Sequence, residues 1–252
     1  MLFLATCAST WLVAGPIYAA CVMTILLFHE AGHYVQAQRY GVPASLPYFL
    51  PMPISPLGTF GAVIAMSPHM PHRRALFDIG ISGPLAGLVP CLAFTVWGVS
   101  RAEIRPIVDG PQLVLGEPLL VQWLVHLVHG PIPEGSTVFF GPIAYAGWVG
   151  ILVTALNLLP IGQLDGGHIL YALLRRRAHA IAWGLMLAAM IAVVVRGLWG
   201  WSLLLVLLLV VGPRHPPTRN DALPLDRGRA LLGWLTLAFF IVGFTPSPLD
   251  FR

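Results

Sequence analysis

The architecture of the chain is set by residues 16–40, whose sequence is PIYAACVMTILLFHEAGHYVQAQRY. Pro16 suits the first turn of a helix, and Gly41 with Pro43 ends it. The segment is long and apolar enough to cross a membrane, for which about 20 residues are needed. Its second half nevertheless carries ionisable side chains, which are costly inside a bilayer. We therefore expect a transmembrane helix whose polar residues have a function.

The polar residues of this helix form the pattern His29-Glu30-Ala31-Gly32-His33. Residues at positions i and i+4 share one face of a helix, so both imidazoles can reach one metal ion. Glu30 projects at a neighbouring angle, from which it can act on water without binding the metal, as in zincins. We expect Gly32 to leave room for water or substrate. The alternative is a buried polar trio held by hydrogen bonds between helices.

A catalytic zinc ion needs a third protein ligand and leaves its fourth position for water. Asp165 is the best candidate because it follows an apolar segment, and because Gly166-Gly167 lets its backbone approach another element closely. An Asp-Gly-Gly sequence by itself is more often a turn. Asp78 is a weaker candidate, since we expect it to pair with Arg73 or Arg74.

Four further acidic residues are predicted to lie on the opposite side of the membrane from His33. They are Glu103, Asp109, Glu117 and Glu134. Of the remaining histidines, only His168, three residues after Asp165, is kept as a candidate outer partner of the metal site.

The composition agrees with a membrane protein. Of the 252 residues, 57% are hydrophobic and 10% are charged, whereas a soluble domain usually has about 25% charged residues. This excludes an ordinary soluble globular protein, and with it a nucleic-acid-binding protein. The net charge of +4 rests on 14 basic residues, all of them arginine. So small an excess is better explained by membrane topology than by a basic patch for phosphates.

Further apolar segments follow the same pattern. Residues 1–14 lack the basic start of a cleavable signal peptide and predict a short membrane helix. Other spans are predicted at about 75–99, 138–160, 179–195, 198–212 and 229–245, with an interfacial helix at 118–129 and a short helix ending at Arg175. The chain length suits about six or seven transmembrane helices.

Residues 42–71 interrupt this helical pattern. The prolines between Pro43 and Pro56 exclude a continuous helix. The segment is nevertheless too apolar for an ordinary loop, and irregular backbone at membrane depth must be buried in protein or line a wet cavity. We expect a re-entrant hairpin or a short sheet.

The predicted fold is thus an all-α polytopic membrane protein with a small membrane-embedded hairpin or sheet. We expect one transmembrane domain over residues 1–252, with a catalytic core at about 16–175 and accessory helices at about 179–245. Arginine counts give the orientation. If the end of segment 16–40 is cytoplasmic, so are most arginines, namely Arg39, Arg73, Arg74, Arg175, Arg176, Arg177, Arg214, Arg219, Arg227 and Arg229. Only Arg101, Arg105, Arg196 and Arg252 then face out. This predicts a cytoplasmic N-terminus, an outer C-terminus and a site toward the cytoplasmic side.

These motifs resemble the site-2 protease family of intramembrane zinc metalloproteases. The resemblance rests on residues 29–33 together with residues 157–167, which read NLLPIGQLDGG. Other similar stretches extend it over nearly the whole chain, namely Gly58-Thr59-Phe60-Gly61, RRALFDIG at 73–80, GPLAG at 83–87 and HPPT at 215–218. They are most similar to the compact bacterial and chloroplast-type branch, which has neither a PDZ-like insertion nor a nucleotide-sensing domain.

The resemblance implies roles for single residues. One Zn²⁺ per chain would be bound by His29, His33 and Asp165, Glu30 would be the general base, and Asn157 would hold substrate or the oxyanion. Substrates would be membrane-anchored proteins cut within or near a transmembrane segment, with a bacterial inner membrane as the expected location. An exposed edge in residues 42–71 could pair with an unwound substrate by strand addition. The alternative for that segment is a hairpin that only plugs the bundle.

Two rival functions are weighed against proteolysis. A zinc-binding membrane transport protein would need ionisable groups along a path through several helices. Here they gather near one depth, which favours a single fixed ion. An inactive homologue acting as a scaffold would have lost a metal ligand or the base, and all four residues are present.

Overall fold

The computed structural model of the chain describes residues 1–107 and 113–251, and these are mainly helical. Asp109 lies outside the described residues. The helices are α1 (Leu2–Arg39), α2 (Arg73–Ser100), α3 (Leu119–His129), α4 (Pro142–Asn157), α5 (Asp165–Leu174), α6 (Arg177–Arg196), α7 (Ser202–Val211) and α8 (Arg227–Gly243), with a 3₁₀ turn η1 (Trp199–Trp201). The strands are β1 (Tyr48–Met52), β2 (Gly58–Val63), β3 (Glu103–Pro106), β4 (Leu113–Leu115), β5 (Ser136–Phe139) and β6 (Leu249–Phe251).

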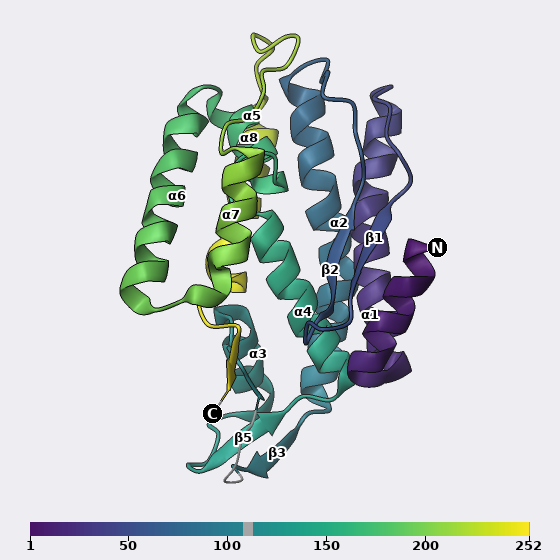
Figure 1. Cartoon of the computed structure of the whole chain (residues 1–252), viewed down its shortest axis with the longest axis vertical. Coiled ribbons are helices and arrows are strands. Elements are labelled where there is room, and N and C mark those ends of the chain that lie inside the picture. Colours follow the sequence, from purple (N-terminus) through teal and green to yellow (C-terminus); the bar gives the residue numbers. More distant parts are fainter. Residues whose placement is uncertain (108–112, 252) are drawn as a thin grey trace.

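Helix α1 is broken where the sequence predicted the end of its first segment. Ala14 and Gly15 have non-helical backbone angles, and Gly15 has a φ of +83°, which favours glycine. The part before the break folds back beside the longer part (Figure 1). It packs on the hairpin of β1 and β2, where the Ser9 hydroxyl donates to the carbonyl oxygen of Gly58 at 2.6 Å. Two helices, at 1–14 and 16–40, are therefore confirmed.

The core of the molecule lies between α1, α2 and α4, which pack together (Figure 1). Its largest fully buried side chains include Tyr18 and Trp148, and Cys91 is also fully buried there. Helices α6 and α7 stand to one side of this bundle (Figure 1). A small separate cluster of Ile161, Met186 and Leu208 joins them to the segment before α5.

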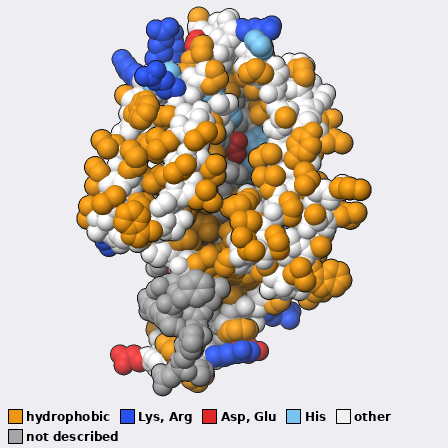
Figure 2. Space-filling view, viewed as in Figure 1, with side chains coloured by type: hydrophobic (Ala, Val, Ile, Leu, Met, Phe, Trp, Pro, Cys, Tyr) orange, Lys and Arg blue, Asp and Glu red, His pale blue; other side chains and the backbone are white. Residues whose placement is uncertain are grey.

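Three helices, α1, α2 and α6, are long and apolar enough to cross a membrane, judged by length and composition. Many large hydrophobic side chains are exposed, and Figure 2 shows them covering most of one face. The predicted span 138–160 is wrong at its start. Helix α4 begins at Pro142 and has 16 residues, because residues 136–139 form β5 and pair with β3.

The Pro-rich segment forms the predicted hairpin. Strands β1 and β2 pair in antiparallel fashion, and the register shifts between Phe49 and Pro51. Two further two-stranded sheets, β3 with β5 and β4 with β6, were not predicted. All four residues of β3 are exposed, so this strand has no alternation of buried and exposed residues that a sequence pattern could reveal.

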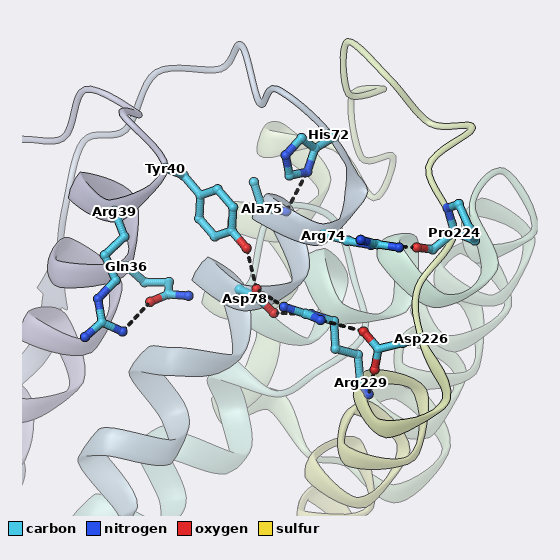
Figure 3. A network of polar contacts seen from close by, with 10 residues as sticks. All are labelled: Gln36, Arg39, Tyr40, His72, Arg74, Ala75, Asp78, Pro224, Asp226 and Arg229. Atoms are coloured by element: carbon cyan, nitrogen blue, oxygen red, sulfur yellow. Dashed lines mark hydrogen bonds and ion pairs between the residues drawn. The ribbon is translucent and has the colours of Figure 1, made fainter.

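Asp78 does not pair with Arg73 or Arg74, so that prediction is wrong. It accepts two hydrogen bonds from Arg229 of α8, at 2.8 and 2.7 Å, and one from the hydroxyl of Tyr40 (Figure 3). Arg73 instead donates to the carbonyl oxygen of Ala172 at the end of α5, and Arg74 to that of Pro224. Both arginines thus donate to backbone carbonyls, and the carboxylate of Asp78 pairs with Arg229 of α8 instead.

Arg229 also pairs with Asp226, the N-cap residue of α8 (Figure 3). The set of Tyr40, Asp78, Asp226 and Arg229 is called the Asp78 network below. It joins the end of α1 and the first turns of α2 and α8 at one end of the bundle. The hydrogen bonds that Arg229 donates to Asp226 lower the pKa of the Asp226 carboxyl to about 2.

Candidate metal centre

Three side chains from two elements converge on one point inside the bundle. His29 and His33 come from α1, and Asp165 is the first residue of α5. One ligand atom from each lies within 4.8 Å of the other two. The Nε2 atoms of His29 and His33 are 3.1 and 3.2 Å from the two carboxylate oxygens of Asp165, and 3.1 Å from each other. The spacing i, i+4 therefore places both rings as the sequence predicted.

The backbone after α4 brings Asp165 to this point. Helix α4 ends at Asn157, and a short irregular segment leads into α5. Gly166 and Gly167 face the backbone carbonyls of Leu158 and Gly162 so closely that a Cβ atom would overlap them. The two glycines thus allow the close approach of backbone that was predicted.

The geometry suits a metal such as zinc. The Nδ1–H of His33 donates to the carbonyl oxygen of Ile79 at 2.8 Å. This fixes the ring and leaves the lone pair of Nε2 free to bind an ion, as in many metal-binding histidines. Two imidazole nitrogens and one carboxylate are a donor set that zinc accepts. The side chains of His29 and His33 are 6% and 5% exposed, so the site is shielded from bulk solvent.

Glu30 lies beside this group and takes no part in it. Its side chain is buried and lines the cavity in front of the histidines. No residue within 1–107 and 113–251 forms a hydrogen bond with its carboxylate. In the same residues, every side-chain oxygen that is fully buried has a hydrogen-bond partner, so the Glu30 oxygens are not fully buried. Its oxygens are therefore open to the cavity and can accept a proton from a water held there.

Helix α2 packs closely against the face of α1 that carries the histidines. A Cβ atom on Gly83 would overlap Nε2 of His33, and Gly87 lies against His29. Gly32 packs on the backbone of Ser82, whose hydroxyl donates to the Gly32 carbonyl at 2.9 Å. The expectation that Gly32 leaves room for water or substrate is therefore wrong, since its missing side chain allows helix packing instead.

The cavity in front of the site has a volume of about 270 Å³. Strand β2 and the segment after it form one wall, including Ala62, Val63 and Ile64. Asn157 also lines it, and its amide nitrogen is 3.3 Å from Nε2 of His29. Figure 2 shows acidic and histidine side chains in a hollow near the middle of the face.

The sequence did not single out His215 as a site residue. It lies in the loop between α7 and α8 and lines the same cavity, where its Nε2 is 2.7 Å from Nδ1 of His168. The loop is fastened through Asp221, which accepts hydrogen bonds from Tyr171 and Thr218 at 2.7 Å. Burial alone would raise the pKa of Asp221, but these hydrogen bonds lower it below its usual value. The only signal for His215 was its place in the HPPT stretch.

Comparison with known proteins identifies related sequences. The model of a family described as "Peptidase family M50" matches residues 17–195. The chain is 32% identical over 240 residues to "Probable zinc metalloprotease EGY1, chloroplastic" of Oryza sativa subsp. japonica, an alignment that covers 90% of this chain and 40% of the relative.

Two further relatives show the same pattern. The Arabidopsis thaliana protein of the same name is 29% identical, over 89% of this chain and 42% of its own length. "Probable zinc metalloprotease EGY2, chloroplastic" of Oryza sativa subsp. indica is 28% identical, over 95% and 44%. The chain thus spans less than half the length of these relatives. The comparison with solved structures found no match.

Proposed function

We propose that this chain, which belongs to peptidase family M50, is an intramembrane zinc metalloprotease. The observation that carries the proposal is the convergence of His29, His33 and Asp165 beside the open carboxylate of Glu30, within a bundle of apolar helices. Its substrates would be membrane-anchored proteins, cut within or near a transmembrane segment. Nucleic acid has no part in this function.

The three ligands would hold one Zn²⁺ per chain. When bound, zinc would act as a Lewis acid toward a substrate carbonyl and make nearby water more acidic. The donor set, the burial of both histidines and the fixed ring of His33 support this choice of metal.

Glu30 would be the general base. A carboxylate that is open to the cavity and does not bind the metal can take a proton from the attacking water. The same carboxylate can then pass that proton to the leaving amine, so one group serves both steps. Asn157, 3.3 Å from His29, is within the same cavity, and its amide N–H groups can donate to the negative charge that develops on the carbonyl oxygen.

A helical substrate must unwind before its peptide bond can be attacked, and β2 offers a partner for the unwound segment. Residues 62–64, the last two residues of β2 and the one after it, line the cavity. On its other side β2 is paired with β1. An extended polypeptide could add to β2 as a further strand and present its backbone to Glu30.

We further propose six to seven membrane helices with the N-terminus in the cytoplasm of a bacterial cell. The exposed apolar surface of α7 and α8 supports membrane insertion, although each has fewer than 18 residues. Helix α4, with 16 residues, is apolar and mostly covered by its neighbours inside the bundle. Arginines gather at the end of the molecule where α1 ends and α2 begins (Figure 2), which supports a cytoplasmic orientation of that end. The cavity would then open toward the cytoplasmic half of the membrane.

The test is cleavage of a single-span reporter protein in proteoliposomes. The wild-type chain should release fragments whose new ends, mapped by mass spectrometry, lie within or next to the membrane segment. Glu30→Gln should bind the same amount of zinc but lose cleavage by at least about 100-fold, the scale of general acid–base catalysis. Equal cleavage by both proteins would disprove the role of Glu30. A transporter or an inactive scaffold would bind the metal and cleave nothing in either form.

A further inference from the structure

A second pair of histidines lines the cavity beside the metal centre. His168 comes from α5, one turn after Asp165, and His215 comes from the loop between α7 and α8. Their rings meet edge to face with centroids 4.9 Å apart, and Nδ1 of His168 is 2.7 Å from Nε2 of His215. At that distance one nitrogen must donate a hydrogen bond and the other must accept it.

The direction of this hydrogen bond follows from the far side of His215. Its Nδ1 is 2.6 Å from the carbonyl oxygen of Pro216. A carbonyl only accepts, so Nδ1 of His215 carries the proton. In a neutral ring Nε2 is then the acceptor, and the donor to it must be the Nδ1–H of His168. With the His168 ring neutral as well, its Nε2 carries a lone pair and no proton.

Several contacts hold His215 in this state. The Tyr171 ring stacks on it with centroids 4.7 Å apart, and Nε2 of His179 donates to its backbone carbonyl at 3.1 Å. Burial and the neighbouring His168 lower the pKa of His215 to about 3, so its ring is neutral at neutral pH. The loop itself is anchored at Pro213, whose carbonyl accepts from the Gly162 N–H at 3.2 Å.

The Nε2 atom of His168 is available to a ligand. Within the described parts of the chain, 1–107 and 113–251, no group forms a hydrogen bond with this nitrogen. Every fully buried side-chain nitrogen in these parts does have a partner, so Nε2 of His168 is not fully buried. This nitrogen is therefore not sealed inside the protein. Because His168 lines the cavity, its lone pair is open to that space. The cavity thus contains a neutral hydrogen-bond acceptor in addition to the carboxylate of Glu30.

We propose that Nε2 of His168 binds substrate by accepting a hydrogen bond from a backbone N–H of the unwound polypeptide, and that His215 positions it by fixing its tautomer. The proposal rests on the proteolytic function above. An unwound substrate has lost the internal partners of its N–H groups, and leaving them unpaired in a shielded cavity is costly. An acceptor that cannot switch to a donor selects for such an N–H.

The tautomer can be tested without any catalytic activity. Nitrogen NMR of the detergent-solubilised, ¹⁵N-histidine-labelled protein distinguishes protonated from unprotonated ring nitrogens, and His168→Asn assigns the signal. We expect His168 to be protonated at Nδ1 only. In His215→Phe, which keeps a ring stacked on Tyr171 but removes the acceptor, this preference should disappear. A proton on Nε2 of His168 in the wild-type protein would overturn the proposal.

Binding tests the contact with substrate. The probe is a synthetic single-span peptide of about 25 residues with a Gly-Pro pair at its centre, bound to the Glu30→Gln protein so that it is not cut. A set of these peptides replaces one backbone N–H at a time by an ester oxygen. At one position the loss of the N–H should weaken binding by about tenfold, the effect of one hydrogen bond. In the double variant Glu30→Gln, His168→Asn, the peptide with that ester should bind as tightly as the peptide that keeps the N–H. If every ester weakens binding equally with and without His168→Asn, the contact does not exist.

Kinetics separate positioning from folding and from metal binding. His168→Gln can place its amide oxygen near the position of Nε2, whereas the shorter Asn cannot. We expect cleavage efficiency, kcat/KM, to fall by about tenfold in His168→Asn and in His215→Phe, mainly through KM, and to be largely restored in His168→Gln. The exposed His69 provides the control His69→Asn, which should match the wild type.

Loss of zinc in His168→Asn would instead make His168 a metal ligand and overturn the proposal. Cleavage by no form of the protein, with the NMR and binding results intact, would count against the proteolytic function alone.

Discussion

At the scale of single residues, the candidate metal centre depends on how closely α2 approaches α1. His33 is held from one side by the carbonyl of Ile79 and touched from the other by Gly83, both in α2. The ring therefore has little freedom to move, and its Nε2 stays directed at Asp165. A preorganised ligand loses less conformational freedom when the metal binds.

Gly83→Ala tests this arrangement. A Cβ atom at this position would overlap Nε2 of His33, so the ring or the helix must shift. We expect zinc affinity to fall by about 10–100-fold, the range seen when the supports of a metal ligand are disturbed. Isothermal titration of the metal-free protein in detergent measures this. A Cβ atom on Gly184 in α6 would meet no atom within 4 Å, so Gly184→Ala is the control and should bind zinc like the wild type. An unchanged affinity in Gly83→Ala would show that the ring is not confined.

The sequence predicted the grouping of these ligands because each carries a local signal. His29 and His33 are spaced for one helix face, and Asp165 stands beside two glycines. The role of Gly32 could not be predicted, since it depends on which helix faces it. His215 was missed for a similar reason, because it meets His168 across 47 residues of sequence without a spacing rule.

At the scale of elements, the Asp78 network fixes α8 to the rest of the bundle. Arg229 donates two hydrogen bonds to Asp78 and also forms an ion pair with Asp226. Two parallel bonds to one carboxylate are stronger and more specific than an ordinary surface ion pair. The side chain of Asp78 is 13% exposed, so its charge is poorly solvated by water and needs this partner.

Arg229→Gln should therefore destabilise the protein. We expect a loss of roughly 1–2 kcal/mol, since the bonds are charge-assisted but Arg229 is partly exposed. This corresponds to a melting temperature lowered by about 2–8 °C, measured by thermal unfolding in detergent. Arg227, two residues earlier and exposed, provides the matched variant Arg227→Gln, which should melt within about 1 °C of the wild type. Equal melting of the two variants would contradict the role of the network.

The helices were easier to predict than their ends and partners. Apolar length located α2 and α6 to within two residues of their ends. The start of α4 was placed too early because Val138, Phe139 and Phe140 are apolar enough to extend a span, but residues 136–139 pair with β3. The prediction for Asp78 was wrong because it chose Arg73 and Arg74, which are near in sequence, whereas Arg229 is brought close to Asp78 only by the fold.

At the scale of the whole molecule, the two ends of the bundle differ. The end of α1, the start of α2 and the α5–α6 turn lie together at one end, and α3, β3, β5 and the C-terminus lie at the other (Figure 1). Arginines gather at the first end (Figure 2). The mainly helical fold was predictable from hydropathy, whereas the small sheets at the second end were not, because their strands are only three or four residues long.

This polarity gives a prediction about orientation. In cells, a membrane-impermeant thiol reagent should label Glu134→Cys from outside, and should label Arg176→Cys only after the membrane is opened. The background protein would have Cys7, Cys21 and Cys91 replaced by alanine. The expected result follows from the tendency of arginine-rich ends to stay in the cytoplasm. Labelling of Arg176→Cys in intact cells would reverse the proposed topology and place the cavity toward the outer side.

The most direct test is a zinc titration of the metal-free protein while reporter cleavage is followed. Cleavage should be absent after chelation, rise with added zinc and level off at one equivalent per chain. Glu30→Gln should take up the same single equivalent without cleaving, and Asp165→Asn should bind zinc at least about 100-fold more weakly. Full cleavage by the metal-free protein, or wild-type zinc affinity in Asp165→Asn, would contradict the assignment of His29, His33 and Asp165 as the site of a zinc-dependent protease.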